Sequence, residues 1–186
     1  MLCEAGVKFD IERVDLATHK TVGGVDFTSI NPKGYVPALV LDNGEVLTEG
    51  PAIEQYIADQ YPQSNLAPPC GTLARARLQE HLTFIGTELH KQFSPLFSPA
   101  NSAEVKNAAI AKINSRFNLM EKHFADGRSY LLGEQFSVAD AYLFVVVNWS
   151  FPMKISLENY PHIAAFHQRV AKRENVQEAL RQEGHA

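Results

Sequence analysis

Two neighbouring pairs of residues have types and spacing that suit the binding of a charged ligand. Glu49 and Gly50 stand directly before Pro51, a residue that fits the first turn of a helix. A free N–H at Gly50 would favour a carboxylate, and the Glu49 carboxylate could accept from an ammonium group. Val36 and Pro37 open the apolar run upstream. The pattern alone also fits a plainer interpretation, in which Val36-Pro37 begins a strand and Glu49 caps the helix.

The residues around these pairs predict a hairpin and then a helix. Residues 36–41 and 45–48 flank Asp42-Asn43-Gly44, a turn sequence in which Asn and Gly tolerate positive φ. Downstream, an apolar stripe predicts a helix from Pro51: Ala52, Ile53, Tyr56 and Ile57. Upstream, apolar residues alternate with polar ones over 7–16, with one slip, which predicts a half-buried strand: Val7, Phe9, Ile11, Val14 and Leu16.

The chain changes character near residue 62. Residues 62–69 cannot continue a helix and are typical of a linker. Two apolar stripes at helical spacing follow it, and we expect Pro95 and Pro99 to separate their helices. The first stripe is Leu78, Leu82, Ile85, Leu89 and Phe93, and the second is Ile110, Ile113, Phe117, Met120 and Phe124.

The last third of the chain predicts three more helices. Ser137 is a good N-cap, and Asp140 can reach back to the free backbone N–H groups. The helix that they start is apolar nearly all round up to Trp149, so we expect it to form the buried centre of the helical part. Pro161 fits the start of a further helix with Ile163, Phe166 and Val170 facing inward, and residues 176–182 make a short last helix.

Composition excludes several classes of function. The chain has 186 residues and a formal net charge of −4, which gives no indication of nucleic-acid or membrane binding. The longest apolar run, Ala141–Val147, is far too short to span a membrane, and no secretory signal is visible. Cys3 and Cys70 form no C-x-x-C or zinc spacing, so we expect reduced thiols in a cytoplasm and no thioredoxin-like oxidoreductase.

Four longer stretches carry a resemblance to a known family. INPKGYVPALVLDNGEVLTEGPAIEQYIAD, TELHKQFSPLF, FSVADAYLF and HIAAFHQRVAKRENVQEAL are similar to bacterial glutathione S-transferases, most of all the beta class. The resemblance implies an α/β, thioredoxin-like domain over 1–62, a linker over 63–69 and an all-α helical-bundle domain over 70–186. It also implies a homodimer, glutathione as cosubstrate, a hydrophobic electrophile and no metal. Phe93, Phe97 and the helices at 72–124 could contribute to the dimer or equally to the domain core.

The resemblance assigns glutathione-binding roles on the first half of the chain. It places Val36 before a cis-proline, Pro37, and implies that the Val36 amide and carbonyl pair with the cysteinyl backbone of glutathione as a strand would. Glu49 and Gly50 would hold the γ-glutamyl end, its ammonium and its carboxylate. A lysine common after the second strand is replaced by His19, with a lysine adjacent, so His19 is a further glutathione-binding candidate.

The resemblance also assigns roles to the segment that begins the helical part. Thr87 and His90 would contact glutathione or line the electrophile pocket, and Lys91 would add positive potential. Thr83 stands where the family has an asparagine and would be a weaker polar contact. His90 is the catalytic candidate, because it could assist ionisation of the thiol whose thiolate is the nucleophile. By its spacing alone, His90 is an ordinary residue at the edge of an apolar stripe.

The largest departure from the family lies at the start. The family opens with a strand, a loop whose Cys or Ser meets the sulfur, and a helix, whereas Met1–Gly6 matches only the last turn of that helix. The expected central strand would be absent between 7–16 and 36–41. Three hypotheses remain open: a misassigned start, a strand 7–16 that shifts or swaps to fill the gap, or a loosely folded first domain.

Two functions are predicted from these residues. The first is a glutathione S-transferase that conjugates the glutathione thiolate to electrophilic small molecules in detoxification. The alternative is a non-catalytic protein of the same fold that binds ligands, which the absent catalytic loop favours. Turnover of an electrophile would separate the two.

Overall fold

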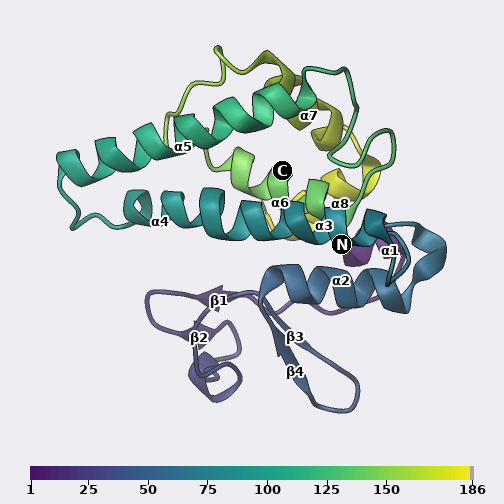
Figure 1. The fold of residues 1–186 in the computed structure, drawn as a ribbon. Helices are drawn as coiled ribbons and strands as arrows, with labels where there is room; N and C mark the ends of the chain where they lie inside the picture. Colours follow the sequence, from purple (N-terminus) through teal and green to yellow (C-terminus); the bar gives the residue numbers. More distant parts are fainter. Residues whose placement is uncertain (185–186) are drawn as a thin grey trace.

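The computed structural model describes residues 1–184, and Figure 1 shows an irregular first part below a layer of long helices. The first part contains α1 (Leu2–Ala5), two small sheets, a 3₁₀ turn η1 (Phe27–Ser29) and α2 (Gly50–Gln60). Helix α2 lies against α6 (Val138–Asn148) of the helical layer, so it joins the two parts. The end of α1 is a left-handed Gly6, as expected for the last turn of a helix.

The predicted strand over 7–16 is wrong for most of its length. Only Val14–Asp15 forms a strand, β1, and it pairs antiparallel with β2 (Lys20–Thr21). Residues 7–10 keep the predicted alternation, with Val7 and Phe9 half-buried, but no strand of the described chain lies beside them. An alternating pattern fixes which side chains face inward, but a strand also needs a neighbour to accept its hydrogen bonds.

The predicted hairpin is confirmed. Strands β3 (Ala38–Val40) and β4 (Val46–Thr48) pair antiparallel with Leu39 opposite Leu47. The backbone N–H of Leu41 donates to the carbonyl of Glu45 at 2.8 Å, and Gly44 takes a φ of 85° in the turn. Within residues 1–184 the two hairpins do not pair with each other and remain separate two-stranded sheets.

The helical part begins with one long, nearly continuous helical segment. It runs through α3 (Leu73–Phe84), a π-helix η3 (Ile85–His90) and α4 (Lys91–Phe97). The predicted break at Pro95 is wrong, because Pro95 lies inside α4. Pro95 has no N–H to donate to the carbonyl four residues before it, but the helix continues past it to Phe97. The chain leaves the helix at Ser98, which is extended, as is usual directly before a proline.

The remaining helices enclose a single apolar core. They are α5 (Ala103–Phe124), α6, α7 (Pro161–Ala171) and α8 (Glu174–Gln182), and Figure 1 shows α5 running alongside the α3–α4 segment. Both predicted stripes face this core, with Ile110 only partly buried. Phe93 is fully buried, so it belongs to the core rather than to an outer surface, whereas Phe97 is half exposed. No helix of the described chain has the length and apolarity to cross a bilayer.

The central helix α6 begins as predicted. The Asp140 carboxylate accepts from the Ser137 N–H at 2.9 Å, the Ser137 hydroxyl at 2.7 Å and the Leu131 N–H at 2.8 Å. Asp140 itself is fully buried, and burial raises its pKa to about 6 in spite of these three donors. The carboxylate thus ties the preceding loop to the first turn of the most buried helix.

The segment between the two parts is held in place by packing. A 3₁₀ turn, η2 (Pro62–Ser64), follows α2, and Leu66 is buried against the helical core. Its carbonyl accepts from the Val138 N–H at 2.9 Å. The start of the chain is fixed in a similar way, since Glu4 of α1 pairs with Arg173 at the head of α8 at 2.7 Å.

Candidate functional site

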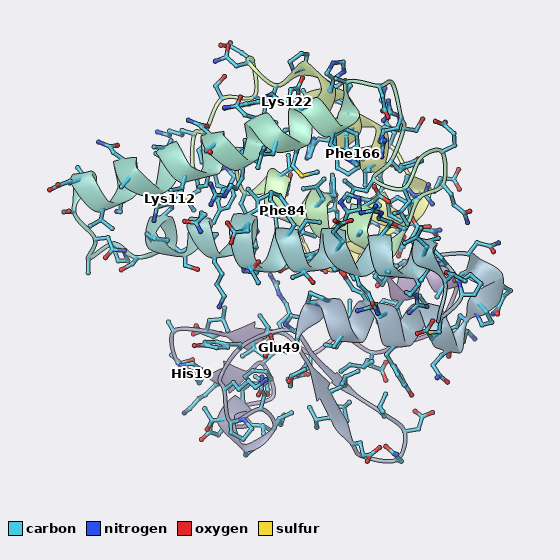
Figure 2. All side chains as sticks on the ribbon, viewed as in Figure 1. His19, Glu49, Phe84, Lys112, Lys122 and Phe166 are labelled. Carbon is cyan, nitrogen blue, oxygen red and sulfur yellow. The ribbon has the colours of Figure 1, made fainter. Side chains whose placement is uncertain are left out.

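A cavity of about 900 Å³ lies between the first part and the helical layer. One wall comes from the segment before β3, the end of β4 and the start of α2, and the other comes from α3, η3, α4 and α6. Figure 2 places Glu49 where these two walls meet. The residues that line the cavity are Leu16, Asn31, Lys33, Tyr35, Val36, Pro37, Thr48, Glu49, Gly50, Pro51, Gln55, Gln79, Leu82, Thr83, Gly86, Thr87, His90, Lys91, Ser94 and Tyr142.

Val36 offers a free backbone edge to this cavity. The Val36–Pro37 peptide bond is cis, and Val36 is about half exposed. Within the described chain, neither the Val36 N–H nor its carbonyl makes a hydrogen bond. The Asn31 side chain holds the preceding residue by donating to the Tyr35 carbonyl at 2.6 Å. A donor and an acceptor are therefore available to an extended, peptide-like ligand.

Glu49 is held in an unusual conformation at the head of α2. Its φ of 72° is one that non-glycine residues rarely adopt. The side chain does not cap the helix, which removes the plainer interpretation of this carboxylate. It accepts instead from the Lys33 ammonium at 2.6 Å, and Lys33 also donates to Thr48 Oγ1 at 3.1 Å. This Lys33 hydrogen bond lowers the pKa of Glu49, so the carboxylate stays ionised.

Gly50 and Pro51 form the first turn of α2, immediately after Glu49 in the chain. Gly50 is the first residue of the helix, where backbone N–H groups have no partner within the helix. The helix dipole adds positive potential at the same point. A site for a negative group at the start of α2 and a site for a cation at the Glu49 carboxylate thus lie side by side, as the binding of an amino acid headgroup would require.

The opposite wall is built on the π-helix η3. Its wider turn keeps Ile85 and Leu89 fully buried while Thr87 and His90 face the cavity. The Thr87 hydroxyl donates to the Thr83 carbonyl at 2.9 Å, which fixes its orientation. Such π segments occur frequently at functional sites.

His90 is a neutral, oriented histidine. Its Nδ1 lies 2.7 Å from the Tyr142 hydroxyl, and its ring stands edge-on to Trp149 with centroids 4.7 Å apart. Burial, with the adjacent Lys91 ammonium, lowers the pKa of His90. Burial, with the charges of Glu54 and Glu49, raises the pKa of Tyr142 to about 12. At neutral pH the imidazole is therefore uncharged and the phenol keeps its proton.

The cavity brings together all but one of the residues singled out from the sequence. Val36, Pro37, Glu49, Gly50, Thr83, Thr87, His90 and Lys91 all line it. His19 does not, and Figure 2 shows it on the first part, away from Glu49. The His19 ring packs against Gly34 instead, so close that a Cβ on that glycine would lie 2.9 Å from the ring.

Sequence reasoning missed three polar groups of the site. Lys33 and Asn31 stand in the Asn-Pro-Lys-Gly turn, which belongs to a stretch that resembles the family but gives no binding signal of its own. Tyr142 lies within the apolar run Ala141–Val147, and a periodicity argument gives no signal for its hydroxyl. The cysteines, by contrast, lie outside the site: Cys3 is in α1 and Cys70 is exposed beside Asp59.

Comparison with known proteins identifies the family. Residues 1–60 match the family model "Glutathione S-transferase, N-terminal domain", and residues 84–174 match "Glutathione S-transferase, C-terminal domain". The glutathione S-transferase GstA of Escherichia coli O157:H7 is 43% identical over 183 residues, which are 98% of this chain and 90% of that protein.

Solved structures agree with this match. A ternary complex of BphK, a bacterial glutathione S-transferase, has a TM-score of 0.96 and 52% identity over 98% of this chain and 91% of that one. A sphingomonad glutathione S-transferase complexed with glutathione has a TM-score of 0.95 and 48% identity over 100% and 92%. The chain therefore belongs to the glutathione S-transferase family, with a thioredoxin-like N-terminal domain and a helical C-terminal domain.

Proposed function

We propose that this protein binds glutathione in the cavity described above and conjugates its thiolate to a hydrophobic electrophile. The observation that carries the proposal is the pairing of two features on one wall: the unpaired backbone of Val36 and the ionised Glu49 beside the head of α2. Val36 pairs with the cysteinyl backbone, while Glu49 and Gly50 hold the γ-glutamyl headgroup. The close relative complexed with glutathione supports this choice of ligand.

The catalytic assignment in this proposal is His90. It faces the cavity from the wall opposite Val36 as an uncharged imidazole. Thr83, Thr87 and Lys91 surround it with hydroxyl groups and one positive charge, which favour an anionic sulfur. His19 does not line the cavity, so its role in binding glutathione rests on the family resemblance alone.

The test is turnover of chlorodinitrobenzene with glutathione, alongside retention on immobilised glutathione. Turnover with retention is the expected result, and Glu49→Gln should raise the KM for glutathione about tenfold because the ammonium loses its charged partner. Glu80→Gln, an exposed carboxylate on α3, is the matched control and should leave KM unchanged. Retention without turnover would instead support the non-catalytic binding protein, and failure of both would overturn the proposal.

We also propose a cytoplasmic homodimer, in which residues 1–62 and 70–186 act as two domains joined by the linker 63–69. Exposed apolar side chains on the α3–α4 segment support a second copy as the partner, since Leu73 and Phe97 are both at least half exposed. Sedimentation velocity should give twice the chain mass. A monomer at micromolar concentration would contradict the dimer without affecting the glutathione proposal.

A further inference from the structure

One hydrogen bond in the cavity joins two helices that are distant in the sequence. Tyr142 lies on α6 and His90 ends η3, and the Tyr142 hydroxyl is 2.7 Å from His90 Nδ1. The two rings meet edge to face with centroids 5.8 Å apart, and both residues line the cavity. The contact therefore fixes one edge of the imidazole and leaves the other edge, Nε2, without a partner in the described chain.

The surroundings hold the phenol in this position. A Cβ added to Gly86 would lie 3.5 Å from the Tyr142 hydroxyl, so the phenol rests directly against the backbone of η3. Two residues before Tyr142, the buried Asp140 fixes the first turn of α6 through three hydrogen bonds. Trp149, the C-cap residue of the same helix, contacts the imidazole ring edge-on from another side.

The direction of the hydrogen bond follows from the proton count. A phenol has one proton, and in the described chain the only hydrogen-bond partner of the Tyr142 hydroxyl is His90 Nδ1. If Nδ1 carried the imidazole proton, the half-buried phenol proton would have no acceptor, which is costly. The titratable groups facing this pair are Lys91, Glu49 and Glu54. Lys91 disfavours the imidazolium form of His90, and the two carboxyl groups disfavour the phenolate form of Tyr142.

We propose that Tyr142 is a positioning residue, whose hydroxyl donates to His90 Nδ1 and holds the imidazole as the tautomer with its proton on Nε2. His90 then presents an uncharged N–H donor to the cavity instead of a lone pair. An N–H donor stabilises an anionic sulfur, whereas a nitrogen lone pair would repel it. The choice of a thiolate as the acceptor rests on the proposed function; the tautomer does not.

The first test reads the tautomer directly, without glutathione. Long-range ¹H–¹⁵N NMR correlations distinguish the two neutral tautomers of each histidine ring, and the His90→Asn variant assigns the His90 signals. We expect the Nε2–H form in the unmodified chain and a mixture of both forms in Tyr142→Phe. An Nδ1–H form in the unmodified chain, or the same tautomer in Tyr142→Phe, would overturn the inference.

A matched control separates this effect from loss of any buried hydroxyl. Tyr160 is buried, and its hydroxyl donates to the Asn114 carbonyl at 3.3 Å inside the helical part, away from the cavity. Tyr160→Phe should therefore leave the His90 tautomer unchanged. An equal change of the His90 signals in both variants would show a general packing effect and contradict the positioning role.

The second test measures the consequence for a bound thiol. The absorbance of the glutathione thiolate in the complex, followed against pH, gives the apparent pKa of the bound thiol. In Tyr142→Phe this pKa should rise, so that kcat at pH 6.5 falls about fivefold while the KM for glutathione changes less than twofold. A change in KM alone would overturn the role. If glutathione does not bind at all, the proposed function fails, and the NMR measurement still decides the tautomer.

Discussion

The two walls of the cavity are built in different ways. The wall that carries His90 belongs to helices whose inner faces are fully buried, including Leu89 and Phe93. The wall that carries Glu49 follows two short hairpins, and within residues 1–48 the only buried apolar side chain is Phe27. Other apolar residues there stay exposed, such as Val22 at 79% and Tyr35 at 70%.

This difference shows two ways to position a functional group. The helical wall uses apolar packing, which is dense and extends over many residues, so that one side chain can be oriented by the whole core. The other wall uses local devices: a turn, an Asn31 hydrogen bond and the Lys33–Glu49 ion pair. We expect the helical wall to dominate stability and the wall that carries Glu49 to affect mainly binding.

The largest effect is expected from a truncation in the helical core. Phe117 is fully buried and meets Tyr160 edge to face at 5.4 Å. Phe117→Ala should lower the free energy of unfolding by roughly 4 kcal/mol, through lost burial and the cavity left behind. Val22→Ala, in the first part, should change it by less than about 0.5 kcal/mol. Urea unfolding of both variants measures the contrast, and similar losses would refute it.

The second effect concerns the buried carboxylate of the helical wall. Asp140→Ala leaves three donors without an acceptor in a fully buried place, and should cost roughly 3 kcal/mol of unfolding free energy. Asp126→Ala, which removes a carboxylate paired with Arg128 at the surface, is the matched control and should have little effect. Thermal unfolding by circular dichroism provides the comparison. A mild Asp140→Ala variant would mean that the loop before α6 is not fixed by this carboxylate.

The third effect is a gain of stability at the boundary between the walls. Glu54 on α2 has a carboxyl oxygen that is buried without a hydrogen-bond partner in the described chain, and burial raises the pKa of Glu54 to about 8. The unfolded chain releases this proton near its ordinary pKa of 4.5, but the folded chain keeps it up to about 8. The stability of the folded state therefore falls as pH rises through this window.

Replacement of Glu54 should cancel that pH dependence. Glu54→Met should raise the unfolding free energy by on the order of 1–2 kcal/mol at pH 8.5 and by less at pH 4.5. Glu80→Met, at an exposed position of α3, should give a difference that does not change between the two pH values. Urea unfolding at both pH values is the measurement, and a gain of equal size at each would exclude ionisation as the cause.

The smallest effect on stability is expected from the ion pair of the wall that carries Glu49. Lys33 and Glu49 are each about half exposed or more, so solvent screens their attraction. Lys33→Met should change the unfolding free energy by less than about 1 kcal/mol. Calorimetric titration with glutathione should nevertheless show a changed affinity, because the Glu49 carboxylate loses its present partner. A large loss of stability would mean that this wall, too, is fixed by packing.

Much of the fold could be predicted because its signals are local. The Asp42-Asn43-Gly44 turn predicts the hairpin of β3 and β4. Pro51 and Pro161 predict the first turns of α2 and α7. The capping residues Ser137 and Asp140 predict the start of α6. Each of these features depends on residues within a few positions of one another, so a short stretch of sequence contains both partners of the interaction that forms it.

Other features depended on contacts that no local pattern contains. The alternation at Val7 and Phe9 could not reveal whether a neighbouring strand lies beside them. Pro95 alone predicts the end of a helix, but α4 continues through it to Phe97, with Phe93 buried and Leu96 packed against the core. The His19 ring was a binding candidate by position, yet its packing against Gly34 keeps it out of the cavity lining.

The sequence by itself determined the β3–β4 hairpin and most of the helices, the segment that offers Val36 and Glu49, and the histidine at the edge of an apolar stripe. Only the tertiary structure decided which groups complete the site. Tyr142 contacts His90 because α6 packs against η3. Lys33 contacts Glu49 because the β3–β4 hairpin between them brings the start of α2 back beside Lys33. Hydrogen bonds between distant residues depend on the packing of whole elements, which periodicity and capping signals do not encode.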